Sequence, residues 1–500
     1  MRPVARRSVV AFALLLAAAA AEACTGMYAG RRVTVDGTTL IGRTIDISPT
    51  DGVGRLARVP RNTRNGNRYS YICTPLVTSL GRGFFASAAV NERGFALSAT
   101  VTAYVNAKIR GLDPYVPAGK GGVGEGDLPA LIAGECATAR EAVEFLARKV
   151  AARGSNSSDI YMFADAGEAW FVEVLTGHQW AAVRMPEDKV AVFGNEFMIR
   201  EFDLNDKANA MHSPDLVKLA GRCSALKWID EQRGVLDLFG TYSGGDYGDS
   251  PHYRTWFGHR MLAPSTAGEY ARDRGCPLFF DPEPGTKISP TNFFEVMRTR
   301  YEGVNCPEEN FNTAIRTIGT TSQHSCHVVQ LRHDLPERYR GTLWYAPSKA
   351  QYSVFLPVNG SADEIDAAFA RDQTERPYRY DPEIAGMEFM RLYTLARMRE
   401  YVFTNSVRRV DVRPCFGGGV REHWRKLERG WAADWNDRLT RAAAADDAAG
   451  LTAYSLSLQR TALADARRMF DGLMWYACGN VRISGDGGGA TDVPKEPYKP

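Results

Sequence analysis

The order of the expected secondary-structure elements constrains the fold of this chain more than any other feature. Alternating and apolar runs predict short strands at residues 25–29, 38–45, 84–90, 94–101, 160–163, 168–174, 180–184 and 190–193. A helix is expected over 138–152, where apolar residues recur at helical spacing and Thr138 followed by Glu141 resembles a capping box. Runs of strands that bracket a helix, rather than a strict alternation of the two, favour a layered α+β architecture over a doubly wound one.

The second half of the chain changes from mixed to helical character. Helices are expected near 216–231 and 292–300, and strands at 326–331, 341–345 and 352–357. Helical periodicity then runs from about 383 to 402 and from 424 to 477. We therefore expect a mixed domain over 24–400, a helical extension over 401–483 and a loose tail over 484–500, which is rich in Gly, Pro and charge.

The first 23 residues have the parts of a cleavable signal peptide. A cationic start precedes the apolar stretch Val9–Ala21, and Ala21-Glu22-Ala23 forms a small-x-small cleavage site. The apolar stretch is shorter than the about 20 residues that span a bilayer. Cleavage would make Cys24 the first residue of the mature chain.

A cysteine at a free N-terminus carries a nucleophile and a base on one residue. The α-amine has a pKa of about 7.7–8.0, so near neutral pH it can accept the thiol proton, directly or through water. Two other interpretations stay open. The leader could be cleaved beside a cysteine that has no catalytic role, or Cys24 could be the lipid-carrying residue of a lipoprotein anchor. The charged Glu22 stands where a lipoprotein leader has a small residue, which argues against the anchor.

Composition limits the partners and the compartment. With 44% hydrophobic residues, 500 residues can bury one large core or two moderate ones. The formal charge of +3 falls to about +1 without the leader, and no basic patch interleaved with aromatics is present, so nucleic acid is not expected as a partner. The cysteines besides Cys24 are compatible with disulfides after export, and sequons at Asn156 and Asn359 could accept glycans in a eukaryotic host.

Three further residues could complete a cysteine-based site. A nearby cation lowers the pKa of a thiol, and Arg43 could supply that cation while Asp46 supplies a carboxylate. The alternative for this pair is an exposed ion pair worth about 0–1 kcal/mol. The amide of Asn195, after an apolar strand, could donate to an oxyanion, and a turn-forming Asn after Gly is the alternative.

Two other motifs are weaker evidence for a binding site. The run Gly119–Gly124 matches a dinucleotide-binding fingerprint, yet Pro114 and Pro117 stand where the preceding strand is required, so a flexible loop is expected. The His and Cys side chains at 324–327 invite a metal interpretation, but no second cluster at zinc spacing accompanies them. Neither a metal nor an organic cofactor is expected.

Several stretches together carry a family resemblance that covers most of residues 24–400. They are Ala23–Thr25, Asp36–Thr39, Gly42–Asp46, Asn91–Gly94, Ser98–Thr100, Thr138–Val143, Ala164–Asp165, Glu168–Trp170, Asn195–Phe197, Tyr253–Trp256, Met297–Gly303 and Gly341–Trp344. In this order and number they resemble the dipeptidase/secernin family of N-terminal-nucleophile cysteine hydrolases. The resemblance implies an αββα sandwich, with two antiparallel sheets between helical layers.

The resemblance also implies roles for individual residues. Cys24 would be the nucleophile and its amine the base, with Arg43 beside the thiolate and Asp46 beside the amine. The amide of Asn195 would donate to the oxyanion, together with the backbone N–H near Thr100. Arg254 matches an arginine of related cysteine acylases and joins the candidate site.

The sequence therefore predicts an exported cysteine dipeptidase that takes small peptides with a free amino end and works through a Cys24 thioester. Secretion, a lysosome-like organelle and a periplasm all satisfy the leader, and no stable membrane insertion is expected after its removal. Two alternatives stay open: an acylase of the penicillin- or bile-salt-hydrolase kind, and a secreted binding or scaffold protein that has lost activity. The oligomeric state is open as well.

Overall fold

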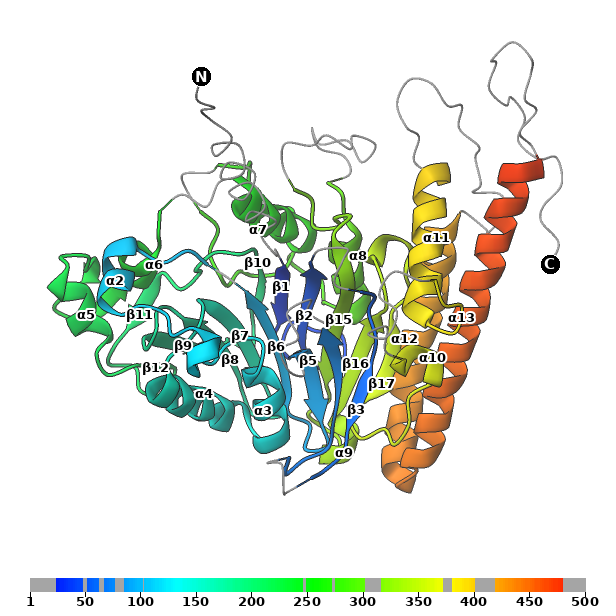
Figure 1. Ribbon diagram of the computed structural model, residues 1–500, viewed down its shortest axis with the longest axis horizontal. Coiled ribbons are helices and arrows are strands. Elements are labelled where there is room, and N and C mark those ends of the chain that lie inside the picture. Colours follow the sequence, from blue (N-terminus) through cyan, green and yellow to red (C-terminus); the bar gives the residue numbers. More distant parts are fainter. Residues whose placement is uncertain are drawn as a thin grey trace, which may run out of the picture.

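Two antiparallel sheets packed face to face form the centre of the molecule, and helices cover their outer faces (Figure 1). The computed structural model describes residues 24–47, 52–62, 67–76, 85–101, 103–245, 249–271, 275–301, 316–371, 380–400 and 419–479. The predicted leader (1–23) and tail (484–500) lie outside the described residues.

The first sheet has six strands, and each neighbouring pair is antiparallel. In spatial order they are β10 (Val190–Phe193), β1 (Thr25–Ala29), β2 (Thr39–Asp46), β15 (Gln323–Leu331), β16 (Gly341–Ala346) and β17 (Leu356–Asn359). The β1–β2 connection turns at Asp36-Gly37, where Gly37 has a φ of +69° that favours glycine. The central strands are buried along their whole length, as expected for a sheet covered on both faces.

The second sheet has eight strands. In spatial order they are β12 (Ala210–His212), β9 (Trp180–Arg184), β8 (Ala169–Val174), β7 (Asp159–Ala164), β6 (Ala96–Val101), β5 (Phe85–Asn91), β4 (Tyr71–Leu76) and β3 (Ala57–Val59). A separate small sheet contains β11 (Glu201–Asp203), β14 (Val235–Asp237) and β13 (Trp228–Asp230).

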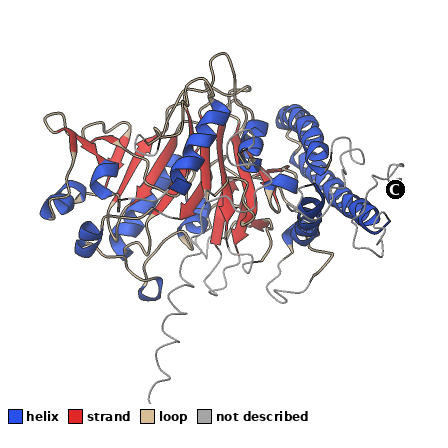
Figure 2. Ribbon diagram, turned by 90° about the horizontal axis from the view of Figure 1, so that it is seen from above, coloured by secondary structure: helices blue, strands red, loops and turns tan. Residues whose placement is uncertain are grey.

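Helices form the outer layers. On the first sheet lie α7 (Asp249–Leu262) and α8 (Pro290–Arg298), and on the second lie α3 (Leu128–Glu135) and α4 (Ala139–Arg153). Figure 2 shows the strands in the middle of the molecule with helices around them. The expected α+β class and the αββα layering are confirmed by this arrangement. The shorter helical segments are α2 (Ala107–Leu112), η3 (Ala118–Lys120), α5 (Leu216–Arg222), α6 (Leu238–Tyr242), α9 (Glu337–Arg340), η4 (Ala350–Tyr352) and α10 (Ala367–Ala370).

The apolar core lies mainly between the two sheets. Tyr28, Ile41 and Val329 of the first sheet belong to one buried cluster with Ile160 and Phe171 of the second. Successive side chains on a strand point to opposite faces, so alternate residues of the first sheet pack instead against α7 and α8 in a second cluster. The first sheet is therefore fixed from both sides.

Three long helices, α11 (Ala385–Glu400), α12 (Val420–Ala445) and α13 (Ala448–Gly479), stand beside β17 at one end of the molecule (Figure 1). Two buried tryptophans of α12 bond to the body of the fold: Trp424 Nε1 donates to the Tyr352 carbonyl at 3.0 Å, and Trp435 Nε1 donates to Thr342 Oγ1 at 2.9 Å. Within the described residues, no helix is both long and apolar enough to cross a membrane.

Local predictions succeeded where short-range signals dominate. Helix α4 begins after Thr138, whose Oγ1 accepts the Glu141 N–H at 3.2 Å, as the capping pattern predicted. The helix expected over 216–231 is wrong in its second half: α5 ends at Arg222, Ser224 has a φ of +54°, and β13 follows. The strand expected at 352–357 begins later, at Leu356, and the run 424–477 is two helices that break at Asp446, with φ +51°.

Candidate active site

The start of β1 and the ends of β2 and β10 lie side by side at one end of the first sheet, and they bring several of the predicted residues together. Cys24 lies directly before β1, Asp46 ends β2, and Asn195 follows β10. Because β1 runs antiparallel to both neighbours, its start lies beside the ends of both. Arg254 reaches the same place from the outer helix α7.

The Cys24 thiol lies in a buried, charged environment. Cys24 is 6% exposed, and this burial raises the pKa of its thiol. The cation of Arg43 lowers that pKa, the carboxylates of Asp46 and Glu125 raise it, and a hydrogen bond from the Asp46 backbone N–H lowers it. In the full chain, whose Cys24 nitrogen is bonded to Ala23, the thiol is therefore held in its protonated form.

Arg43 points between the sheets, where it meets Glu125. Its Nη1 donates to Glu125 Oε1 at 2.9 Å, and the two side chains are 1% and 6% exposed. Among the described residues, Nε and Nη2 of Arg43 find no hydrogen-bond partner. Arg43 and Asp46 are both buried, which excludes the alternative of an ordinary exposed ion pair between them.

Asp46 lies on the opposite face of β2, three residues along the strand. Its Oδ2 accepts from Thr44 Oγ1 at 3.2 Å and pairs with Arg316 Nη2 at 3.2 Å. Burial raises the pKa of Asp46 to about 6, against the opposing effect first of Arg316 and then of Arg254. Its Oδ1 has no partner among the described residues, so this oxygen is available to a cationic group beside Cys24.

Arg254 connects the nucleophile to Asn195. Its Nη1 donates to the Cys24 carbonyl at 2.5 Å and to Thr25 Oγ1 at 3.2 Å, and its Nη2 donates to Asn195 Oδ1 at 2.9 Å. Because Oδ1 accepts from a guanidinium, the NH2 group of Asn195 is directed away from Arg254 as a donor. The geometry suits an amide that donates to an oxyanion.

Thr100 lies on β6 of the second sheet, where it pairs with Ile160. The side chain of Thr100 lies outside the described set, and the expected oxyanion role of the backbone near it stays a prediction. Two residues of the site were not predicted from the sequence. Glu125 lies in a loop whose glycine pattern indicated only a turn, and Arg316 follows no periodic pattern.

The His and Cys side chains of β15, which invited a metal interpretation, are His324, Cys326 and His327. Cys326 and His327 are neighbours on a strand and point to opposite faces, so they cannot bind one ion. His327 Nε2 bonds Ser98 Oγ at 2.9 Å, and burial, followed by the charge of Arg43, holds the pKa of His327 well below its usual value. No group of three potential ligands occurs within the described residues.

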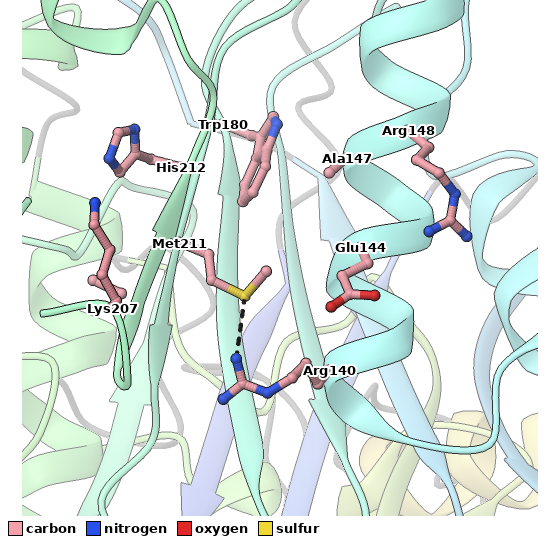
Figure 3. A pocket seen from close by; sticks show the side chains of 9 residues that line it. Arg140, Glu144, Ala147, Arg148, Trp180, Lys207, Met211 and His212 are labelled. Carbon is pink, nitrogen blue, oxygen red and sulfur yellow. Dashed lines mark hydrogen bonds between the residues drawn. The ribbon is translucent and has the colours of Figure 1, made fainter.

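A pocket of about 650 Å³ lies elsewhere, at the β12 edge of the second sheet (Figure 3). Its lining consists of Arg140, Glu144, Ala147, Arg148, Trp180, Lys207, Ala210, Met211 and His212. Arg140 is already held by Glu168, through bonds of 3.0 and 3.1 Å. None of the predicted catalytic residues lines this pocket.

Features expected of an exported protein are not seen in the described part of the chain. Six cysteines there, Cys24 among them, are free thiols, and the side chains of Cys306, Cys415 and Cys478 lie outside the described set. Asn359 is 4% exposed and its Nδ2 donates to the Gly341 carbonyl, so a glycan there would require this bond to break.

Known proteins share the sequence pattern over most of the chain. The model of peptidase family C69 matches residues 23–383. Probable dipeptidase B of Streptococcus pyogenes serotype M1 is 28% identical over 384 residues, covering 71% of this chain and 75% of that protein. Probable dipeptidase B of Lactococcus lactis subsp. lactis (strain IL1403) is 29% identical over 384 residues, covering 72% and 78%. A mutant of conjugated bile acid hydrolase from Clostridium perfringens aligns with a TM-score of 0.30 and 15% identity, over 69% of this chain and 94% of that one.

The expected resemblance to the dipeptidase/secernin family is confirmed by these matches, and the protein is a cysteine peptidase of the N-terminal-nucleophile type. The match ends at residue 383, before α11 begins. With most of its length matched, the chain belongs to peptidase family C69.

Proposed function

We propose that this protein is an exported dipeptidase that works through a thioester on Cys24, formed after residues 1–23 are removed. The observation that carries the proposal is the position of Cys24, buried directly before β1 among Arg43, Asp46 and Arg254. The relatives named as probable dipeptidases support a dipeptide substrate. The signal-peptide pattern of the leader supports export to a secreted, lysosome-like or periplasmic location.

The environment of Asp46 supports a free amine at Cys24. Its Oδ2 is occupied by Thr44 and Arg316, while Oδ1 has no partner in the described part of the chain. A buried carboxylate oxygen without a partner is costly, and the amine exposed by leader removal would supply one. Asp46 ends β2, the strand that pairs with β1 directly after Cys24, which supports a position of its carboxylate close to the Cys24 amine.

The reaction would proceed in two halves. The amine of Cys24 takes the thiol proton, and the sulfur attacks the carbonyl carbon of the scissile amide. Arg43 stabilises the thiolate, and the Asn195 amide with the backbone N–H near Thr100 donates to the oxyanion. The C–N bond then breaks, and the leaving nitrogen takes the proton from the Cys24 ammonium. Water, deprotonated by the same amine, attacks the thioester, and the thiol regains a proton as the first amino acid leaves.

Three forms of the protein test the proposal: the mature chain, a chain that retains its leader, and Cys24→Ala. Mass spectrometry and N-terminal sequencing should show a mature chain that starts Cys-Thr-Gly-Met. This chain should hydrolyse dipeptides, and both other forms should lose at least about 10³-fold in kcat/KM. Cys223→Ala, at a partly exposed free thiol, is the matched control and should keep full activity.

Two results would contradict the proposal. Equal activity with and without the leader would exclude the amine as base. Hydrolysis of acyl amides but of no dipeptide would favour the acylase alternative, and a mature chain inactive on both would favour a scaffold.

A further inference from the structure

Glu125 is a buried carboxylate next to the nucleophile that the proposed mechanism leaves unused. It lies in the loop before α3, and its backbone N–H donates to Asp159 Oδ2 of β7 at 3.2 Å. From there its side chain crosses to the first sheet and pairs with Arg43 at 2.9 Å. Its charge also acts on the Cys24 thiol. Glu125 therefore lies in the region between the two sheets that also holds Arg43 and the Cys24 thiol.

A dipeptide with a free amino end brings a cation close to the Cys24 sulfur when it binds for the reaction. Its ammonium nitrogen is two bonds from the scissile carbonyl carbon, so it lies a few Å from the sulfur that attacks this carbon. Two carboxylates act on the thiol, those of Asp46 and Glu125. Asp46 is bound by Thr44 and Arg316, and its remaining oxygen is assigned to the amine of Cys24. Glu125 is the other carboxylate, and we therefore consider it the one that can pair with the ammonium group of the substrate.

We propose that Glu125 binds the α-ammonium group of the substrate and thereby selects small peptides with a free amino terminus. This inference rests on the proposed dipeptidase function and names the residue that sets its substrate class. Ammonium binding would draw the Glu125 charge from Arg43, whose guanidinium would then act more fully on the Cys24 thiolate. Substrates with a free amine would in this way increase the reactivity of the nucleophile.

The charged and titratable groups around Glu125 are consistent with this role. Arg43 approaches from β2, Asp159 and Tyr161 from β7, and Cys24 from the start of β1. Arg43 brings one positive charge to Glu125, and Asp159 brings a second acidic group close by. A substrate ammonium would add a positive charge beside these two carboxylates and help to balance them.

The test compares two substrates that differ only in the ammonium group: alanyl-alanine and propionyl-alanine. The mature protein should prefer alanyl-alanine, and Glu125→Gln should reduce this preference, measured as the ratio of kcat/KM values, by about 10- to 100-fold. Glu125→Asp keeps the charge and should keep part of the preference. Glu187→Gln is the matched control, since it removes an ion-paired carboxylate at the far end of β1 and should leave the ratio unchanged.

A second measurement separates binding from a merely structural role. The pH midpoint of Cys24 alkylation by iodoacetamide, without substrate, should fall in Glu125→Gln, because Glu125 raises the pKa of this thiol. Equal losses of kcat/KM on the two substrates in Glu125→Gln would refute ammonium binding by Glu125, whatever the alkylation midpoint. Failure of the mature protein to hydrolyse alanyl-alanine would instead refute the proposed function itself, and with it this inference.

Discussion

Replacement of Glu428 by alanine should weaken the junction between the C-terminal helices and the body of the fold. Glu428 of α12 accepts from Arg298 of α8 at 2.5 and 2.8 Å, and both side chains are 2% exposed. Arg298 also donates to the carbonyls of Ala350 and Ser353, and the Phe355 N–H donates to Glu428 at 2.8 Å. Arg298 also pairs with Glu295 at 3.0 Å, so the alanine variant would lose both bonds between Arg298 and Glu428 and would leave the Phe355 N–H without its acceptor.

The expected cost follows from this loss of partners. Breaking a buried ion pair by removal of one partner costs about 3–5 kcal/mol. An unfolding entropy of about 2.1 cal/mol/K per residue corresponds to about 1 kcal/mol/K for the 500-residue chain. Because Glu295 still pairs with Arg298, the lower end of the range applies, and the variant should melt about 3 °C below the wild type.

Differential scanning calorimetry of the mature protein measures this shift. Arg429→Ala is the matched control, because the next residue of the same helix is 59% exposed and pairs with Glu422 at 2.9 Å. An exposed pair of this kind is worth about 0–1 kcal/mol, so the control should shift by no more than about 1 °C. Joint replacement by apolar residues, Arg298→Met with Glu428→Leu, should recover part of the loss, because the unpaired charge is gone while the backbone groups of Ala350, Ser353 and Phe355 still lack their partners. A Glu428→Ala shift as small as that of Arg429→Ala would refute the reasoning.

Three further predictions concern the catalytic site. Protonation of the Cys24 amine already lowers kcat/KM on the acid side, and since burial raises the pKa of Asp46 to about 6, this acid limb should become steeper below that value, as the protonated acid loses its hold on the amine. A limb of unchanged slope down to about pH 4.5 would contradict this. Arg316→Gln removes the cation from Asp46 and should move the same limb to higher pH, and an unmoved limb would exclude the pairing. Gly26→Ala would place a Cβ 2.1 Å from Cζ of the Phe193 ring, two residues before Asn195. It should destabilise the fold by about 1–3 kcal/mol and lower kcat/KM, so a variant with wild-type melting temperature and activity would be evidence against this contact.

Much of the local structure and part of the site could be predicted from the sequence. The cap of α4 and the strands between 160 and 193 depend on residues a few positions apart, and the structure contains them with small shifts at their ends. The helix expected over 216–231 failed because its periodic pattern was overridden by a turn at Ser224 and by strand pairing to β14. The residue pattern of one segment carries no information about the strand with which that segment will pair in the folded protein.

The sequence by itself predicted that Cys24 would stand first after a cleavable leader, which stays a prediction, and that Arg43 and Asp46 would lie on one strand in a fold of layered strands and helices, which the structure contains. The tertiary structure alone decided which strands are neighbours. Pairing of β10 with β1, across more than 160 residues, brings Asn195 beside Cys24, although the preceding strands β7 to β9 belong to the other sheet. Glu125 and Arg316 entered the site in the same way, because a buried charge finds its partner through the packing of distant segments, and no local spacing encodes that contact.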